Sequence, residues 1–198
     1  MMIKRLFAIC SLTMLIISLA ACGGLRFSQV SPEAADFHPR KIAVFPVEMA
    51  GNDKEAKSAV EKIVARALAD QKWFSGITDT ESLNRRLLAN EELHKITNDY
   101  LSKLQTVNFS DPDLSRKIGD IMDVDAFLLV SVDIWQYTME KEDKVAKVGL
   151  GMQLYEAATG KLMWKAGHQI TKSYILIKPE LPDVARDVVE KMVDYMPH

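Results

Sequence analysis

The chain has 198 residues, of which 48% are apolar and 26% charged, and its formal net charge is −2. This length provides one domain, with room for a small second one. With 25 Lys and Arg against 27 Asp and Glu, the surface lacks the excess of positive charge that binds a nucleic-acid backbone. Two cysteines exclude a disulfide-dense scaffold and a zinc site made of four cysteines. A nucleic-acid partner is therefore not expected.

The N-terminal segment has the pattern of an export signal. Lys4 and Arg5 precede an apolar stretch over residues 6–21, which is interrupted only by serine and threonine. This stretch is too short to span the ~30 Å hydrocarbon core of a bilayer as a stable helix, and its length is typical of a signal peptide. We therefore expect residues 1–21 to be a cleaved signal.

The end of this segment, Leu19-Ala20-Ala21-Cys22, resembles the lipobox of bacterial lipoproteins. The resemblance implies cleavage between Ala21 and Cys22, a diacylglycerol on the Cys22 thiol and an acyl chain such as palmitate on its amino group. Gly23, in place of aspartate, implies an outer-membrane location by the sorting rule of enteric lipoproteins. The alternatives are a plain secretory signal that is cut nearby and an uncleaved N-terminal anchor.

Beyond the signal, the pattern predicts a tether followed by a single domain. Glycine, serine and proline punctuate residues 22–40 without sustained periodicity, which favours a flexible tether that begins at the lipidated cysteine. Regular apolar spacing starts at residue 41, so a single α/β domain is expected over residues 41–198.

The apolar spacing alternates between helix and strand periods along residues 41–198. Strands are expected over 41–47, 126–137, 144–157 and 162–170, and helices over 56–68, 83–88, 98–105, 111–122 and 181–193. The last three strands follow one another with a tight turn at 158–160, which predicts an antiparallel meander. The expected fold class is therefore α/β (α+β), a mixed sheet with a C-terminal three-stranded antiparallel meander covered by amphipathic helices.

Three segments in this order resemble a group of bacterial envelope lipoproteins, namely the CsgG, LpoB and TolB N-terminal-domain-like group. They are Lys-Ile-Ala-Val-Phe-Pro at 41–46, Val-Asp-Ala-Phe-Leu-Leu-Val-Ser-Val at 124–132, and Leu-Tyr-Glu-Ala-Ala-Thr-Gly-Lys-Leu-Met-Trp at 154–164. The resemblance implies a fold and an envelope location more than an activity. The CsgG channel builds its pore from long extra hairpins, whereas residues 138–143 form only a short charged connection here. A pore of that kind is not expected.

No recognisable catalytic motif occurs in the sequence. It lacks a Gly-x-Ser-x-Gly nucleophile elbow, a phosphate-binding loop and a His-Glu-x-x-His metal motif. Asp111 and Asp113 flank a proline, which is typical of a helix start rather than of acid–base catalysis. His168 lies alone on a strand, as packed or solvent-facing histidines do. We expect no catalytic residue, no metal and no cofactor apart from the covalent lipid.

Aromatic residues on the predicted meander provide the remaining candidate site. They are expected to be core residues or cross-strand pairs, or alternatively to form an exposed contact patch. These residues are Trp135, Tyr137, Tyr155 and Trp164.

The sequence therefore favours a periplasm-facing lipoprotein, anchored to the outer membrane, that acts as a non-catalytic binding or assembly module for an envelope complex in secretion, export or cell-wall synthesis. Its expected partners are the membrane, through the lipid, and an envelope protein, with a homo-oligomer as a further possibility. One alternative is a small-ligand-binding or hydrolytic envelope protein with a pocket at the sheet edge. The other is a ring-forming component of a secretion channel.

Overall fold

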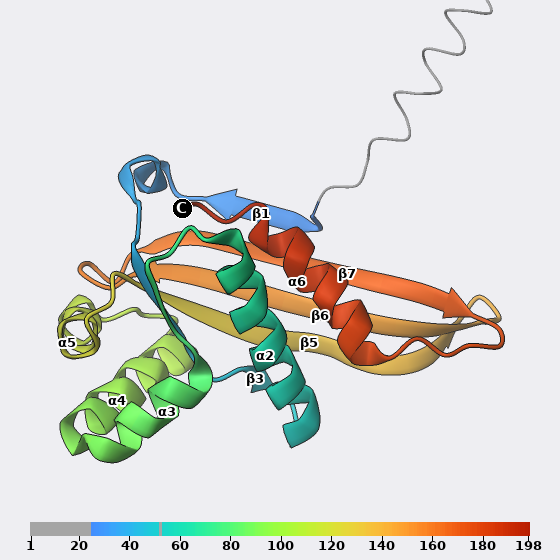
Figure 1. Ribbon diagram of the computed structural model, residues 1–198, viewed down its shortest axis with the longest axis horizontal. Coiled ribbons are helices and arrows are strands. Elements are labelled where there is room, and N and C mark those ends of the chain that lie inside the picture. Colours follow the sequence, from blue (N-terminus) through green and yellow to red (C-terminus); the bar gives the residue numbers. More distant parts are fainter. Residues whose placement is uncertain (1–24, 52) are drawn as a thin grey trace, which may run out of the picture.

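The computed structural model describes residues 25–51 and 53–198, so the expected signal peptide and Cys22 lie outside the described residues. Figure 1 shows a twisted sheet with helices on both of its faces. In chain order the elements are β1 (Phe27–Val30), η1 (Pro32–Asp36), β2 (Lys41–Val44), β3 (Glu48–Met49), α2 (Lys54–Gln71), β4 (Gly76–Thr78), α3 (Thr80–Ala89), α4 (Glu91–Val107), α5 (Pro112–Met122), β5 (Ala126–Glu140), β6 (Asp143–Glu156), β7 (Leu162–Tyr174) and α6 (Leu181–Val193).

The predicted antiparallel meander is confirmed as the centre of a seven-stranded sheet. Its strands have the order β1-β7-β6-β5-β2-β4, and the remaining strand, β3, lies off this path. β2 lies between β4 and β5 and runs parallel to both, and the short β3 also pairs with β5. The mixed α/β fold class is therefore confirmed. β5, β6 and β7 are much longer than the other strands, and their far ends project beyond the helices as an arm (Figure 1).

The predicted tether is wrong over residues 27–39, because this segment belongs to the folded domain. β1 pairs antiparallel with β7, from Phe27 opposite Gly167 to Val30 opposite Trp164. A 3-10 helix follows, and Phe37 beyond it is buried. All β1 side chains are exposed, so this edge strand is held in the sheet mainly by its main-chain hydrogen bonds to β7. Such a strand needs no apolar alternation, which is why the sequence pattern does not reveal it.

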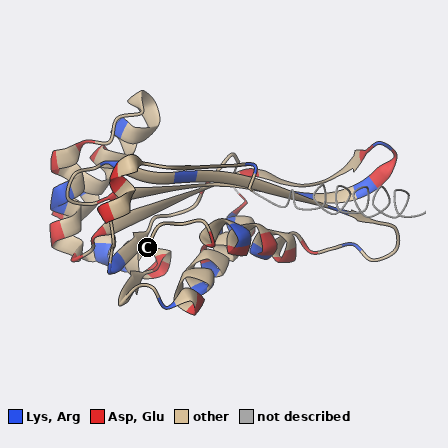
Figure 2. Ribbon diagram, turned by 90° about the horizontal axis from the view of Figure 1, so that it is seen from above, with Lys and Arg blue, Asp and Glu red and all other residues tan. Residues whose placement is uncertain are grey.

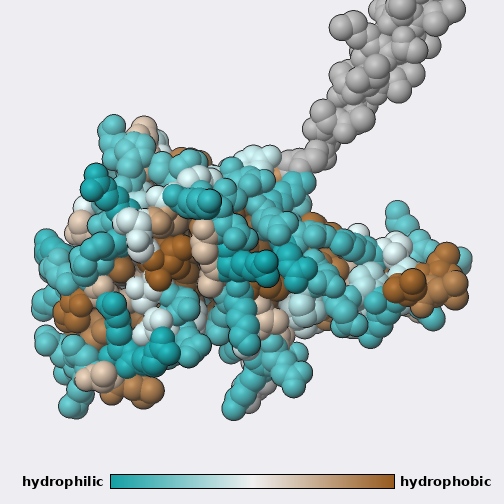
Figure 3. Space-filling model, viewed as in Figure 1, coloured by the Kyte–Doolittle hydropathy of each residue, from teal (hydrophilic) through white to brown (hydrophobic). Residues whose placement is uncertain are grey.

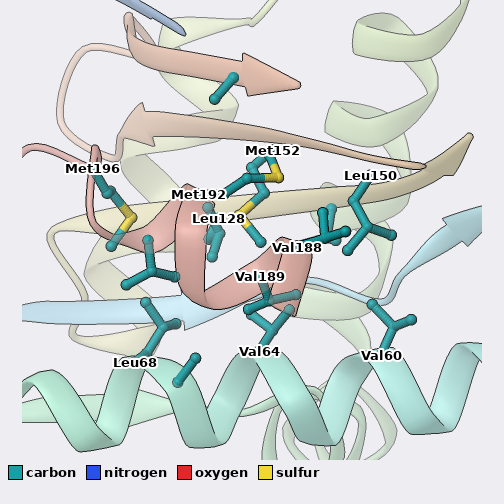
Figure 4. Packing of buried hydrophobic residues seen from close by; sticks show 14 of the residues in the cluster. Val60, Val64, Leu68, Leu128, Leu150, Met152, Val188, Val189, Met192 and Met196 are labelled. Atoms are coloured by element: carbon teal, nitrogen blue, oxygen red, sulfur yellow. The ribbon is translucent and has the colours of Figure 1, made fainter. Parts of the chain in front are cut away.

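One face of the sheet packs against α2 and α6. Valine, leucine and methionine side chains from both helices contact the inward residues of β5 and β6 in a continuous apolar cluster (Figure 4). The labelled members are Val60, Val64 and Leu68 from α2, Val188, Val189 and Met192 from α6, Met196 after α6, and Leu128, Leu150 and Met152 from the sheet.

The opposite face carries a smaller cluster under α3, α4 and α5. Phe127 at the start of β5 makes edge-to-face contacts with Phe45 and Tyr100, with ring centroids 5.3 and 6.0 Å apart. α4 is longer than the predicted helix over 98–105. Its buried face includes Thr97 and Tyr100, so the apolar spacing that marks a helix is weak in this part of the sequence. These three helices cover only the end of this face near β2.

Asp111 caps α5, as its position before Pro112 predicts. Its Oδ1 accepts hydrogen bonds from the backbone N–H groups of Asp113 and Leu114 at 3.0 and 3.2 Å, and Lys103 Nζ lies 2.6 Å from its Oδ2. The Lys103 hydrogen bond, together with the backbone N–H of Leu114, lowers the pKa of Asp111 from its ordinary value of 3.8. The interpretation of Asp111 as a cap is confirmed.

This lowered pKa predicts a loss of stability in acid. A carboxyl group whose pKa is lower in the folded state stabilises the fold above its unfolded pKa, and that contribution disappears as the pH falls below about 4. Asp111→Asn keeps an acceptor for the backbone but removes the charge, so its urea midpoint should fall less steeply between pH 6 and pH 3 than that of the wild type. Asp113→Asn, at a position 79% exposed, is the matched control and should follow the wild type. Parallel curves for the wild type and Asp111→Asn would contradict the assignment.

Candidate binding groove on the open sheet face

The face of β5, β6 and β7 that points away from α6 remains partly uncovered and carries a groove of about 320 Å³. Because side chains alternate along a strand, residues adjacent to the buried Val130 and Met152 point to this other face. Figure 2 shows that charged residues lie mainly on the helices and on the β5–β6 turn, whereas the long strands carry few. The lining includes Phe27 from β1, Glu48 from β3, Leu104, Gln105 and Asn108 at the end of α4, and Leu129, Ser131, Asp133, Gly151, Gln153 and Lys165 from the meander.

Two paired glycines on this face of the sheet leave space for neighbouring side chains of the groove. Gly151 on β6 lies opposite Gly167 on β7. A Cβ atom at Gly167 would lie 2.3 Å from Cε1 of Phe27, and one at Gly151 would lie 2.6 Å from Oγ of Ser131. The glycines therefore allow the Phe27 ring and the Ser131 hydroxyl to lie against the sheet, and any larger residue would displace them. Phe27 keeps 49% of its surface exposed, so an apolar ring face remains available there.

The opposite wall of the groove is polar. Gln105 near the end of α4 donates a hydrogen bond from its amide to Oε1 of Glu48, which joins the helix to β3. Asn108 ends α4 in a left-handed conformation with φ of 52°. These contacts place amide and carboxylate groups beside the strands, where they can bind a polar ligand or the main chain of an extended peptide.

A β-bulge directs Asp133 into the groove. The register between β5 and β6 shifts between Val132 and Ile134, so Asp133 is the additional residue on β5. Bulges of this kind reorient a side chain and are common near functional sites. Ser131 Oγ donates a hydrogen bond to Asp133 Oδ1 over 3.0 Å, which fixes the carboxylate. The groove thus combines carboxylates, amides, the Lys165 ammonium group and an aromatic ring.

The four aromatic residues predicted as a core cluster or a contact patch separate into different environments. Trp164 and Tyr155 are buried, with 0% and 5% of their surface exposed, in the clusters on opposite sides of the sheet. Trp135 and Tyr137 are half-buried against the α2–α6 cluster. Trp164 and Tyr155 are therefore core residues, as the first of the two expectations has it, and they cannot belong to an exposed patch. Trp135 and Tyr137 remain half-exposed on the face that carries α2 and α6.

Burial has a direct effect on Tyr155, since it raises the pKa of this phenol to about 12. The Tyr155 hydroxyl donates to Oε1 of Gln153 over 2.9 Å, and this contact holds the Gln153 amide at the edge of the groove. Tyr155 therefore supports a groove residue from the core and does not itself form a contact surface.

His168 is a packed strand residue on the face opposite the groove. It pairs with Leu150, a member of the α2–α6 cluster, and its Nδ1 accepts the backbone N–H of Arg26 at 3.3 Å. Partial burial, with the nearby Lys191, lowers the pKa of His168 and favours the neutral ring that this hydrogen bond requires. Within residues 25–51 and 53–198, no cluster of three or more His, Cys, Asp or Glu could hold a metal ion.

Sequence reasoning missed most of the groove residues, because they come from elements far apart in the chain. The signal that was present is the row of Gly149, Gly151 and Gln153 on the face of β6 opposite its apolar residues. Small residues in a strand interior indicate a close approach of another group, which here is Ser131 for Gly151 and Ile134 for Gly149.

Comparison with known proteins identifies a shared fold. No protein-family model and no curated protein sequence matches the chain. The structure is similar to the PelC dodecamer from Paraburkholderia phytofirmans, with 16% identity and a TM-score of 0.55 over 84% of this chain and 92% of that chain. It is also similar to lipoprotein GNA1162 from Neisseria meningitidis, with 15% identity and a TM-score of 0.50 over 80% of this chain and 100% of that chain.

The chain thus shares its fold with PelC and with lipoprotein GNA1162. This confirms, at the level of the fold, the resemblance to the envelope lipoprotein group. The LpoB C-terminal domain from Salmonella enterica also matches, with 16% identity over 71% of this chain and 89% of that chain, but its TM-score of 0.37 supports no inference. At identities this low the similarity shows the fold alone.

Proposed function

We propose that this protein is a lipoprotein, anchored to the bacterial outer membrane and facing the periplasm, whose α/β domain is a non-catalytic binding or assembly module for an envelope complex. The complex would act in secretion, export or cell-wall synthesis. The observation that carries the binding role is the groove on the open sheet face, where polar groups and an exposed Phe27 ring surround strand residues that include Gly151.

A binding role fits the groove better than a catalytic one. The groove groups bond to one another, Ser131 to Asp133 and Gln105 to Glu48, which fixes their positions as recognition surfaces require. His168, the histidine that lies on a strand of the meander, is on the face that carries α2 and α6 and not on the groove face.

Lipidation of Cys22 would make such binding effective at modest affinity. A lipid confines the domain to a thin layer beside the membrane, and this raises its effective concentration toward partners in the same membrane. Two features support this part of the proposal, the Leu-Ala-Ala-Cys sequence and the fold shared with lipoprotein GNA1162.

Photo-crosslinking in cells tests the binding role. A photoreactive amino acid at Gln153, an exposed residue in the groove, should yield an adduct with an envelope protein. The matched control is the same amino acid at Lys62, which is exposed on α2 on the other side of the sheet. Adducts from the Lys62 position alone, or from neither position, would contradict the groove as the binding surface.

A homo-oligomeric ring is the second candidate function, because the similar PelC structure is a dodecamer. Adducts of Gln153 with a second copy of the same chain would favour this candidate over a different envelope protein. Native mass measurement of the detergent-extracted protein then gives the number of chains, and a monomer at all concentrations would contradict a ring.

A further inference from the structure

The connection between β7 and α6 presents three consecutive aliphatic side chains to solvent at the end of the arm. Ile175, Leu176 and Ile177 are 91%, 94% and 86% exposed, and we call these residues the apolar tip. Figure 3 shows it as a hydrophobic patch at the far end of the molecule. Single exposed apolar residues are normal, whereas a consecutive run at a projecting end indicates a contact surface. We propose that the apolar tip inserts into the surface of the phospholipid bilayer, as a second membrane contact beside the lipid on Cys22.

The tip is held outward by contacts at its base. The Tyr137 hydroxyl donates to the backbone carbonyl of Pro179 over 2.9 Å, and Lys178 Nζ lies 3.4 Å from the centroid of the Tyr137 ring. Tyr174, the last residue of β7, packs edge-on against the same ring at 6.2 Å. Both sides of the loop are thus fixed to β5, so the three aliphatic side chains are presented to solvent by a rigid base. This lowers the entropy lost when they bind a surface.

The apolar tip lies at the end of the molecule toward which the N-terminal segment runs. Because β1 is antiparallel to β7, the chain traced back from Phe27 follows β7 toward its C-terminal end. Arg26 continues this path, since its backbone N–H donates to His168 and its guanidinium donates to Oε1 of Gln169 over 3.4 Å. Figure 1 shows the start of β1 pointing toward the same end as the arm.

The chain length between Leu25 and Cys22 keeps the lipid near this end. Cys22 precedes Leu25 by three residues, so their Cα atoms are at most about 11 Å apart. The path of β1 brings Leu25 level with about Gln169, and Ile175 lies six residues farther along, or about 20 Å at the rise of a strand. A bilayer that holds acyl chains on Cys22 is therefore within reach of the tip. This inference rests on the proposed lipidation of Cys22.

The groups around the tip indicate shallow insertion. Tyr137 and Tyr174 lie directly behind the aliphatic residues, and tyrosine favours the headgroup region of a bilayer. The β5–β6 turn at the same end carries Lys141 and Glu142, and Asp143 follows at the start of β6; charges of both signs resist entry into hydrocarbon. None of the helices in the described part of the chain has the length and apolar composition of a membrane span. The expected depth is the boundary between headgroups and acyl chains.

Site-directed fluorescence in vesicles tests the proposal with the full chain. A polarity-sensitive fluorophore is attached to the thiol of Leu176→Cys, and the protein is mixed with vesicles of phosphatidylethanolamine and phosphatidylglycerol that contain a lipid-borne quencher. The matched control is Leu88→Cys, which replaces a leucine of similar exposure, 88%, on α3; this helix lies at the opposite end of the molecule (Figure 1). The unsubstituted chain, treated identically, gives the background from Cys10 and Cys22.

The expected result is a blue shift and quenching for Leu176→Cys when vesicles are present, with neither effect for Leu88→Cys. Equal signals at both positions would overturn the proposal. A blue shift of Leu176→Cys that appears without vesicles and grows with protein concentration would also overturn it, because a second copy would then cover the tip.

The mass of the protein from cells separates this proposal from that of the anchor. An acylated chain whose Leu176 label stays in water leaves the anchor intact and overturns insertion of the tip. A chain without acyl groups whose Leu176 label enters the bilayer contradicts the anchor and supports the tip as a membrane contact.

Discussion

Replacement of Trp164 with alanine is expected to lower the free energy of unfolding by about 3–5 kcal/mol, the usual cost of truncating a buried tryptophan. Trp164 is fully buried on β7 within the cluster under α2 and α6. Its indole N–H also donates to the Ser28 hydroxyl over 3.0 Å, which links β1 to the core. The substitution therefore leaves a cavity and removes the hydrogen bond to Ser28 at the same place.

Urea unfolding followed by circular dichroism measures this loss. Ser28→Ala removes the hydrogen bond but retains the indole, so it should cost about 0.5–1.5 kcal/mol. Leu88→Ala, at a position 88% exposed, should change the stability by less than about 0.5 kcal/mol. A loss for Trp164→Ala no larger than that for Ser28→Ala would contradict the placement of the indole in the core.

Replacement of Cys22 with alanine is expected to abolish acylation. The thiol of Cys22 is the proposed attachment point of the diacylglycerol, and alanine has no nucleophile in its place. Labelled fatty acid should be incorporated into the wild-type protein and not into Cys22→Ala. The mass of the wild-type protein should fit a chain that begins at a modified Cys22.

The natural control for this experiment is the other cysteine of the chain, Cys10. Cys10 lies within the apolar part of the proposed signal, so Cys10→Ala should retain both acylation and cleavage. Incorporation of fatty acid into Cys22→Ala would show that the lipid is attached elsewhere, or that the label reports another modification. Loss of acylation in Cys10→Ala would contradict removal of the signal at Cys22.

The regular part of the fold could be predicted because its residues alternate between buried and exposed positions. Along β5 and β6, residues such as Val132 and Leu150 face the helices, and the strand period of two is visible without any knowledge of their neighbours. The helices α2, α5 and α6 likewise follow the spacing of one apolar face, and Asp111 with Pro112 marks the start of α5.

The parts that could not be predicted depend on neighbours in space. β1 is held by main-chain hydrogen bonds to β7, and its side chains carry no apolar pattern. The groove combines Phe27, Glu48, Gln105 and Asp133, which come from different elements, and no local spacing brings them together. The bulge that directs Asp133 into the groove results from the pairing of β5 with β6, so it too is a property of the assembled sheet.

The two ends of the described chain complete the structure together, and this has a consequence for the order of folding. β1 is the outermost strand on β7, while His198 stacks on Trp73 with ring centroids 3.8 Å apart and its carbonyl lies 3.0 Å from Nδ1 of His38. These contacts join residues that are more than 120 positions apart in the sequence, so they form only after residues 162–198 have been synthesised. A nascent chain that lacks β7 and α6 exposes an unfinished sheet and stays open. Such delayed closure is compatible with the proposed export signal, because an exported chain crosses the membrane before it folds.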